Sequence, residues 1–221
     1  MYYLDLHTHS AEIPHDSGHV AIRSFDLSEG EAFNAWPGLR SVGFHPWYLP
    51  GHWAESLPLL ARLLGDNRTP LLGEAGLDAL RGPAPDVQLA AFTAQARLAD
   101  EMGKPVVVHC VRAFDALERL YRSKNFSSPW IIHGFNKGGD TAEKMSASGF
   151  FFSFGAALLR HNSPAADVFS RLPIDKVLLE TDAAAASVTA VYERAAALRG
   201  LPIAVLADAI YANWQRLKLI D

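Results

Sequence analysis

The sequence predicts an α/β protein with a (β/α)8 TIM barrel, and three observations support this fold class. Eight short apolar runs occur along the 221 residues, and most are rich in β-branched, leucine or aromatic side chains. Longer amphipathic stretches separate the runs, as expected where helices follow buried parallel strands. Histidine, aspartate and glutamate stand at the ends of several runs. In a barrel of this kind the reactive site lies at the carboxyl ends of the strands.

Each apolar run has the length of one strand, and glycine or proline bounds most of them. The predicted strands, in chain order, are residues 2–7, 20–25, 39–45, 70–77, 105–109, 129–133, 150–154 and 176–182. Right-handed crossovers between successive strands would keep all of them parallel. The runs therefore predict a parallel sheet in which strands alternate with helices.

Amphipathic stretches between the runs predict the helices. The clearest are residues 86–102, 112–124, 139–148, 164–172, 187–199 and 202–217. In the first stretch apolar residues recur close to the helical period, and Pro202 opens the last, where its missing N–H costs nothing. The pattern is weakest in the short unit Val20–Arg40 and after the third run. We therefore allow for a distorted barrel, with a doubly wound open sheet as the structural alternative.

Length, charge and cysteine content limit the class of protein. Because roughly 100–200 residues form one domain, we expect residues 1–221 to be a single domain. Lysine and arginine total 20 and aspartate and glutamate total 24, so the net charge of −4 argues against nucleic-acid binding by bulk charge alone. The single cysteine, Cys110, excludes an intramolecular disulfide. With no signal-peptide pattern and no long apolar run, we predict a cytoplasmic protein without membrane contact or an obligate protein partner.

The polar side chains at the ends of the runs form the candidate site. They are His7, His9, His45, Glu74, Asp78, His109, His133, Glu180 and Asp182. His7 and His9 lie two residues apart, so their side chains face the same side of a strand. Imidazole and carboxylate together suit Zn²⁺, Mn²⁺, Fe²⁺ or Ni²⁺, and a carboxylate can bridge two ions. The number of donors favours two ions about 3.5–4 Å apart over one.

Each of these residues alone also has a structural interpretation. Glu74 and Asp78 could cap the following turn, and Asp182 could cap a helix. A histidine that ends a strand is more often a satisfied polar residue than a ligand. The coincidence of six candidate ligands at strand ends favours the metal site.

The motifs in this order resemble the TatD family of metal-dependent hydrolases, within the amidohydrolase-like (β/α)8 group. The matching segments are D-L-H-T-H (5–9), S-V-G-F-H-P-W (41–47), G-E-A-G-L-D (73–78), Q-x3-F-x2-Q (88–95), K-P-V-V-V-H-C-V-R-A-F-D (104–115), W-I-I-H-G-F (130–135), E-T-D (180–182) and N-W-Q-R-L (213–217). The sequence looks closest to a short bacterial subgroup with compact loops. Two departures concern the site: E-T-D is followed by A-A-A-A instead of A-P, and Trp47 stands where many members have a second histidine.

The resemblance implies a role for each site residue. The implied metal ligands are His7, His9, Glu74, His109, His133 and Asp182, and they would hold one or two divalent ions, Zn, Mg or Mn, with two favoured. Glu74 and Asp182 would be catalytic, with Asp182 handling the proton of the attacking water. Asp78, Glu180 and His45 would orient ligands and water. Arg112 and Lys137 would hold a substrate phosphate, or else stand as solvated surface charges.

The expected function is divalent-metal-dependent hydrolysis of ester bonds by a metal-activated water. The substrate class implied by the resemblance is DNA or another phosphodiester, so the protein would be a deoxyribonuclease acting on DNA ends or single strands. We expect Phe135 and Trp47 to stack a terminal base. The alternative is a metal-dependent hydrolase of a small amide, lactone or ester, because fold alone does not settle function. A non-catalytic binding protein is the third hypothesis, and the intact ligand set argues against it.

Overall fold

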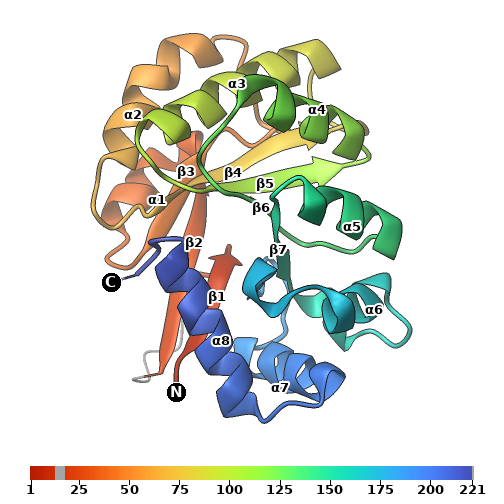
Figure 1. The fold of residues 1–221 in the computed structure, drawn as a ribbon. Helices are drawn as coiled ribbons and strands as arrows, with labels where there is room; N and C mark the ends of the chain where they lie inside the picture. The colour runs from red at the N-terminus through yellow and green to blue at the C-terminus, as the bar shows by residue number, and fades with distance from the viewer. Residues whose placement is uncertain (13–17, 221) are drawn as a thin grey trace. The chain divides into compact units, whose positions relative to one another are not determined.

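The computed structural model describes residues 1–12 and 18–220, and the chain divides into two compact units (Figure 1). The first unit comprises Met1–Arg23 and His133–Asp221, and the second comprises Ser24–Ile132. The first unit is therefore built from both ends of the chain. A single domain over residues 1–221 stays a prediction from chain length.

Eight strands occur among the described residues, and their order in the sheet follows the chain. They are β1 (Tyr3–Thr8), β2 (His19–Asp26), β3 (Arg40–Gly43), β4 (Leu71–Asp78), β5 (Val106–Val111), β6 (Trp130–Ile132), β7 (Phe151–Phe154) and β8 (Val177–Leu179). Each overlaps one predicted run, and every pairing described is parallel. The apolar runs thus identified the strands correctly.

In the first unit, β1 pairs with β2, and β7 pairs with β8. Its helices are α5 (Gly139–Ala147), α6 (Pro164–Arg171), α7 (Val188–Arg199) and α8 (Ile203–Arg216), with 3-10 turns η3 (Ala156–Leu159) and η4 (Ile174–Lys176). Helix α8 lies along β1 (Figure 1). The buried hydroxyl of Tyr192, on α7, binds both backbone groups of Leu4 on β1, at 3.0 and 3.1 Å. This contact ties α7 to the strand that carries His7.

In the second unit, the parallel pairs are β3 with β4, β4 with β5 and β5 with β6. Its helices are α1 (Gly30–Ala35), α2 (Leu57–Leu64), α3 (Pro85–Glu101) and α4 (Phe114–Lys124), with 3-10 turns η1 (Leu27–Glu29) and η2 (Trp53–Ser56). Helix α3 packs on β4, and its Phe92 ring meets Trp130 of β6 at 4.9 Å between ring centroids. The long amphipathic helix therefore covers the strands that carry Glu74 and His109.

The six predicted helices are present, and the structure explains the weak part of the pattern. Helices α1 and α2 are only 6 and 8 residues long. Six residues show too few apolar repeats for periodicity to reveal α1, whereas α2 has the same length as the predicted α6. The later helices begin at sequence-encoded caps: Ser163 and Ser187 accept hydrogen bonds from Ala165 and Ala190, respectively.

No single described helix is long and apolar enough to cross a membrane. Helices α7 and α8 reach that length and composition together, but they are bent by 106° at the break between them. Their apolar side chains, among them Val191, Ile210 and Trp214, are buried inside the first unit.

Candidate metal centre

The backbone of the first unit brings the end of β1 against the segment that follows β8. Asp182 N donates a hydrogen bond to His7 O at 2.8 Å, and His9 N donates to Asp182 O at 3.2 Å. These bonds hold the Asp182 carboxylate so that Oδ1 lies 3.7 Å from His7 Nε2 and 3.6 Å from His9 Nε2. The backbone of Asp182 is left-handed, with φ 55°. Two main-chain hydrogen bonds therefore join Asp182 to residues that lie 173 and 175 positions earlier in the sequence.

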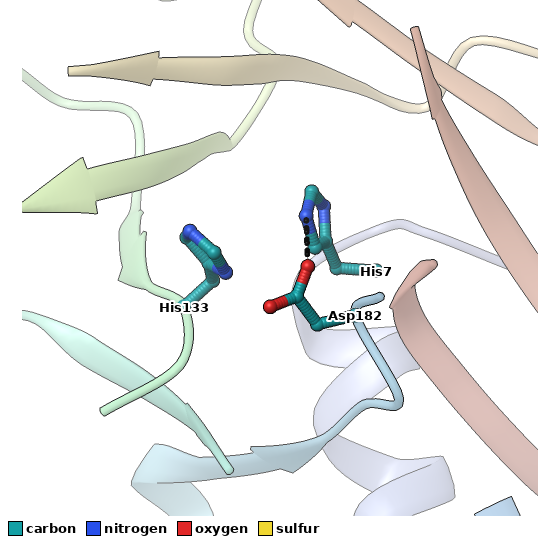
Figure 2. A group of neighbouring side chains, drawn as sticks. All are labelled: His7, His133 and Asp182. Carbon is teal, nitrogen blue, oxygen red and sulfur yellow. Dashed lines mark ion pairs between the residues drawn. The ribbon is translucent and has the colours of Figure 1, made fainter. Parts of the chain in front are cut away.

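His133 completes a group of three donors in this unit. Its ring centroid lies 4.5 Å from that of His7, and one donor atom each from His7, His133 and Asp182 lies within 4.8 Å of the others. Figure 2 shows the two imidazoles and the carboxylate pointing toward one another. His7 is fully buried, whereas the Asp182 side chain is 43% exposed. The group therefore combines a buried imidazole, that of His7, with the carboxylate of Asp182, which solvent can reach.

Glu180 lies behind His133, where it is fully buried. Its Oε1 is 3.6 Å from His133 Nδ1 and accepts a hydrogen bond from Gly134 N at 2.7 Å. Burial acts to raise the pKa of Glu180, but its interaction with His133 and the nearby His7 outweighs burial and lowers the pKa overall. The carboxylate of Glu180 therefore faces His133, and an orienting role for Glu180 stays a prediction.

Asp5, which sequence reasoning did not single out, supports the same segment. Its two carboxylate oxygens accept hydrogen bonds from Thr181 N at 2.9 Å and from Thr181 Oγ1 at 2.6 Å. Burial raises the pKa of Asp5 to about 7, although the bonds from Thr181 act in the opposite direction. Asp5 thus fixes the residue directly before Asp182. Two signals for it were available in the sequence: it is the first residue of the D-L-H-T-H motif, and it lies among apolar residues of the first predicted strand.

The second unit brings together His45, Glu74 and His109, with one donor atom each within 4.8 Å of the others. Glu74 Oε1 lies 2.6 Å from His109 Nδ1 and 3.1 Å from His45 Nε2. The local fold depends on Gly76, because a Cβ at this position would collide with His109 O on the neighbouring strand. The close approach of β4 to β5 therefore requires glycine between the two acidic residues Glu74 and Asp78.

The hydrogen bonds of His45 favour one tautomer of its neutral ring. Its Nδ1 accepts a hydrogen bond from Trp47 N at 3.1 Å, so the hydrogen of the neutral ring is on Nε2. Nε2 then donates to Glu74 Oε1. This arrangement places His45 against Glu74, and an orienting role for His45 stays a prediction.

Asp78 holds the other side of His109. Its Oδ2 lies 3.1 Å from His109 Nε2 and accepts a hydrogen bond from Trp47 Nε1 at 2.6 Å. Burial acts to raise the pKa of Asp78, but the hydrogen bonds from Trp47, Leu80 N and His109 lower it overall. Histidines that bind metals commonly donate their second N–H to a carboxylate. Donation to Asp78 would leave His109 Nδ1 facing Glu74.

Two glutamines of α3 anchor the loops of this unit. Gln88 Oε1 accepts from Asp78 N at 2.8 Å, and its Nε2 donates to the carbonyl oxygens of Asp78, Arg81 and Pro83. Gln95 Oε1 accepts from Phe44 N at 2.7 Å. The motif that contains both residues was visible in the sequence, but its anchoring role was not.

The donor set fits a divalent metal ion in each unit. His7, His9, His133 and Asp182 belong to the first unit, and Glu74 and His109 belong to the second. Imidazole nitrogen and carboxylate oxygen are the donors that Zn²⁺ and Mn²⁺ accept in hydrolases. Among the described residues, candidate donor groups are His7, His133 and Asp182 in the first unit and His45, Glu74 and His109 in the second, and the full set of six ligands stays a prediction.

The residues predicted to bind substrate lie at the surface or in the core. Arg112, with φ 52° directly after β5, and Lys137 are exposed. Trp47 is 37% exposed, but Phe135 is only 2% exposed. Phe135 packs on Phe152 and Phe154 at centroid distances of 4.9 and 5.9 Å. The expectation that Phe135 stacks a base is therefore wrong, because its ring belongs to the core.

Comparison with known proteins places relatives of this chain among metal-dependent hydrolases. The model of the TatD related DNase family matches residues 25–218. An Escherichia coli K12 protein named as an uncharacterized metal-dependent hydrolase, YcfH, is 32% identical over 197 residues, covering 82% of this chain and 74% of its own. A protein named 3'-5' ssDNA/RNA exonuclease TatD, from Erwinia tasmaniensis, is 29% identical over 153 residues, which are 65% of this chain and 57% of its own.

The fold has a close counterpart among solved structures. The crystal structure of YjjV, a TatD homolog from Escherichia coli K12, superposes with a TM-score of 0.83 and 23% identity, covering 97% of this chain and 96% of that one. This likeness confirms the predicted α/β class and the (β/α)8 fold.

Proposed function

This chain belongs to the TatD-related DNase family of metal-dependent hydrolases, and we propose that it is a phosphodiesterase that cleaves DNA at ends or in single strands. One observation carries the proposal. The Asp182 carboxylate is held by two backbone hydrogen bonds beside His7 and His9, with its side chain 43% exposed. A carboxylate that is both fixed and accessible can take a proton from water that enters from solvent.

A bound divalent ion would lower the pKa of water and stabilise negative charge on a phosphoryl oxygen. In the first unit His7, His9, His133 and Asp182 would hold such an ion, and Glu180 would keep His133 in orientation. Asp182 would also orient the attacking water and accept its proton. The backbone of Asp182 is left-handed, and its carboxylate lies toward His7 and His9. Its N–H and C=O groups still form hydrogen bonds with the backbone of His7 and His9 at the end of β1.

In the second unit Glu74 and His109 would be the ligands. His45 would fix Glu74 by donating from Nε2, and Asp78 would fix His109 by accepting from Nε2. One or two divalent ions, with two favoured, remain the prediction for the cofactor.

The preference for nucleic-acid ends or single strands rests on two facts. Relatives of this chain carry the name 3'-5' ssDNA/RNA exonuclease. The net charge of −4 disfavours a broad electrostatic grip on duplex DNA, which depends on many lysine and arginine contacts.

The test compares the purified protein with Asp182→Asn on single-stranded and duplex oligonucleotides, with Mg²⁺, Mn²⁺ or Zn²⁺ added. We expect Asp182→Asn to lose at least about a hundred-fold in rate, because general-base catalysis contributes roughly 10²–10⁴-fold. Asp208→Asn, an exposed aspartate of α8 in the same unit, is the matched control and should keep full activity. Equal rates for the protein and Asp182→Asn would contradict the proposal. Turnover of small lactones or esters, with none of oligonucleotides, would favour the alternative substrate class.

A further inference from the structure

An exposed group of aromatic and cationic side chains adjoins the histidine and carboxylate group of the second unit. Tyr48 is 64% exposed, Trp47 is 37% exposed, and Arg81 is exposed as well. The Arg81 guanidinium carbon lies 4.6 Å from the centroid of the Trp47 ring. We propose that Arg81, Tyr48 and Trp47 form a nucleotide subsite, in which Arg81 binds a phosphate and Tyr48 stacks on a base. This inference rests on the proposed function and deepens it.

The subsite is tied to the candidate metal ligands by one carboxylate. Asp78 Oδ2 faces His109 Nε2 and also accepts from Trp47 Nε1, while Asp78 Oδ1 accepts from Arg81 N at 3.1 Å. Asp78 therefore contacts both His109 and the backbone of Arg81. A phosphate bound by Arg81 would lie on a segment that Asp78 anchors.

Trp47 positions Arg81 and is not itself the stacking platform. Its ring meets those of His45, Tyr48 and His109 edge to face at 4.9, 6.3 and 5.5 Å, and Arg81 covers a face. A guanidinium held over an aromatic ring keeps its N–H groups free for a phosphate, and less side-chain freedom is lost on binding.

Tyr48 is the residue with an accessible ring. One side of it meets His45 at a centroid distance of 5.4 Å, and its 64% exposure leaves room for a base. An exposed aromatic ring beside a cation is the usual composition of sites for single-stranded nucleic acid.

The backbone holds the two segments of the subsite together. A Cβ on Gly82 would collide with Pro46 O, so the loop after β4 lies directly on the segment that carries Trp47 and Tyr48. Gln88 Nε2 donates to Arg81 O at 2.9 Å from the other side. Arg81 is thus preorganised next to the two aromatic residues.

The test measures binding without hydrolysis, in a metal chelator, so that it is independent of turnover. The probe is a short single-stranded oligodeoxynucleotide labelled at one end and followed by fluorescence anisotropy, and a second probe carries an abasic unit at the other end. We expect Arg81→Gln to weaken binding of both probes about ten-fold and to reduce the slope of log K against log salt by about 0.7, the value for one phosphate contact on a single strand.

Tyr48→Leu should weaken binding of the intact probe by about five-fold or more, because stacking contributes about 1–3 kcal/mol per base, and should leave the abasic probe unaffected. Trp47→Leu should behave like Arg81→Gln, because Arg81 loses its support. Arg97→Gln, an exposed arginine of α3, is the matched control and should bind both probes like the unaltered protein.

Unchanged binding in Arg81→Gln and Tyr48→Leu would overturn the subsite, and so would an equal loss of both probes in Tyr48→Leu. Absence of binding by the unaltered protein would overturn it as well. Failure of the proposed function looks different: the unaltered protein would then bind the probes through these residues but would not cleave them when metal is added.

Discussion

Glu180 illustrates how a single buried charge could set the properties of the candidate centre. Its carboxylate has no exposure and faces His133 Nδ1 at 3.6 Å. We expect Glu180→Gln to lower the affinity for Zn²⁺ or Mn²⁺ about 10–100-fold, because residues that orient a ligand typically have effects of this size. Isothermal titration calorimetry measures the change directly.

The amide replacement is chosen because it keeps an oxygen for the bond from Gly134 N and removes only the charge. Glu143→Gln, an exposed glutamate of α5 in the same unit, serves as the control and should leave metal affinity as it was. If both substitutions left the affinity unchanged, Glu180 would have no part in orienting His133.

Gly76 is a second residue whose environment permits a sharp prediction. Its missing side chain allows β4 to lie against the backbone of His109. We expect Gly76→Ala to lower the free energy of unfolding by at least about 2 kcal/mol, because the added methyl group must displace backbone. Urea denaturation followed by circular dichroism gives the value. Gly30→Ala, at a helical position with nothing within 4 Å of the added methyl, should be neutral or stabilising, and a similar loss in both variants would refute the argument.

At the scale of elements, α3 acts as a scaffold for two loops. Gln88 makes four hydrogen bonds to the segment from Asp78 to Pro83. We expect Gln88→Leu to cost about 1–3 kcal/mol in unfolding free energy, because it leaves buried backbone groups without partners. It should also reduce hydrolytic activity, since Asp78 loses its support. Leu89→Gln, one residue along and 38% exposed, should change stability by less than about 0.5 kcal/mol. Comparable losses in the two variants, measured by urea denaturation, would exclude a special role for Gln88.

The elements were largely predictable, and the reasons lie in their length and environment. The strand from Val106 to Val111 begins with three consecutive valines, and α3 shows the helical period over 17 residues. Helix α1 was missed because six residues are too few to show periodicity, whereas α2 was missed although α6, of the same length, was recognised. Phe135 was misjudged because it follows His133 at a strand end, where sequence position alone does not distinguish the core from the mouth.

The loops that carry the proposed nucleotide subsite were also beyond sequence reasoning. Arg81 and Tyr48 lie 33 residues apart in segments without regular structure. Their proximity depends on Gly82 and on the side chain of Gln88, and neither leaves a periodic signal. Prediction from strand ends therefore finds the residues that end strands, such as His45 and Glu74, and misses residues that loops bring beside them.

For the whole molecule, metal binding should be measurable as stability. Ligand at about a hundred times its dissociation constant stabilises by about 2.7 kcal/mol, and this corresponds to a rise in Tm of about 5–10 °C for a chain of this size. We expect the Tm, followed by scanning calorimetry, to fall by this amount when a chelator removes divalent ions and to recover when Mn²⁺ or Zn²⁺ is restored. The double variant His7→Asn, His109→Asn removes one predicted ligand from each unit and should lose most of this response. A Tm that is the same with chelator and with metal would show that the folded protein holds no ion.

The division into two units was not predictable, although the residues of both units were. The boundaries at Arg23 and at Ile132 fall in or at the end of strands, where a linker between units is not expected. The ligand candidates could be found because each stands in a recognisable motif. Their grouping by unit depends on which distant chain segments pack together, and a short stretch of sequence does not reveal this packing.

The left-handed backbone at Asp182 affects how replacements of this residue should be interpreted. Asparagine and aspartate tolerate this conformation better than other residues with side chains, whereas alanine pays about 1–2 kcal/mol to adopt it. An alanine scan would consequently mix conformational strain with loss of the carboxylate and would exaggerate the chemical importance of the position. The amide isostere separates the two effects, and a screen for altered enzymes at this site should sample asparagine and glycine before any branched residue.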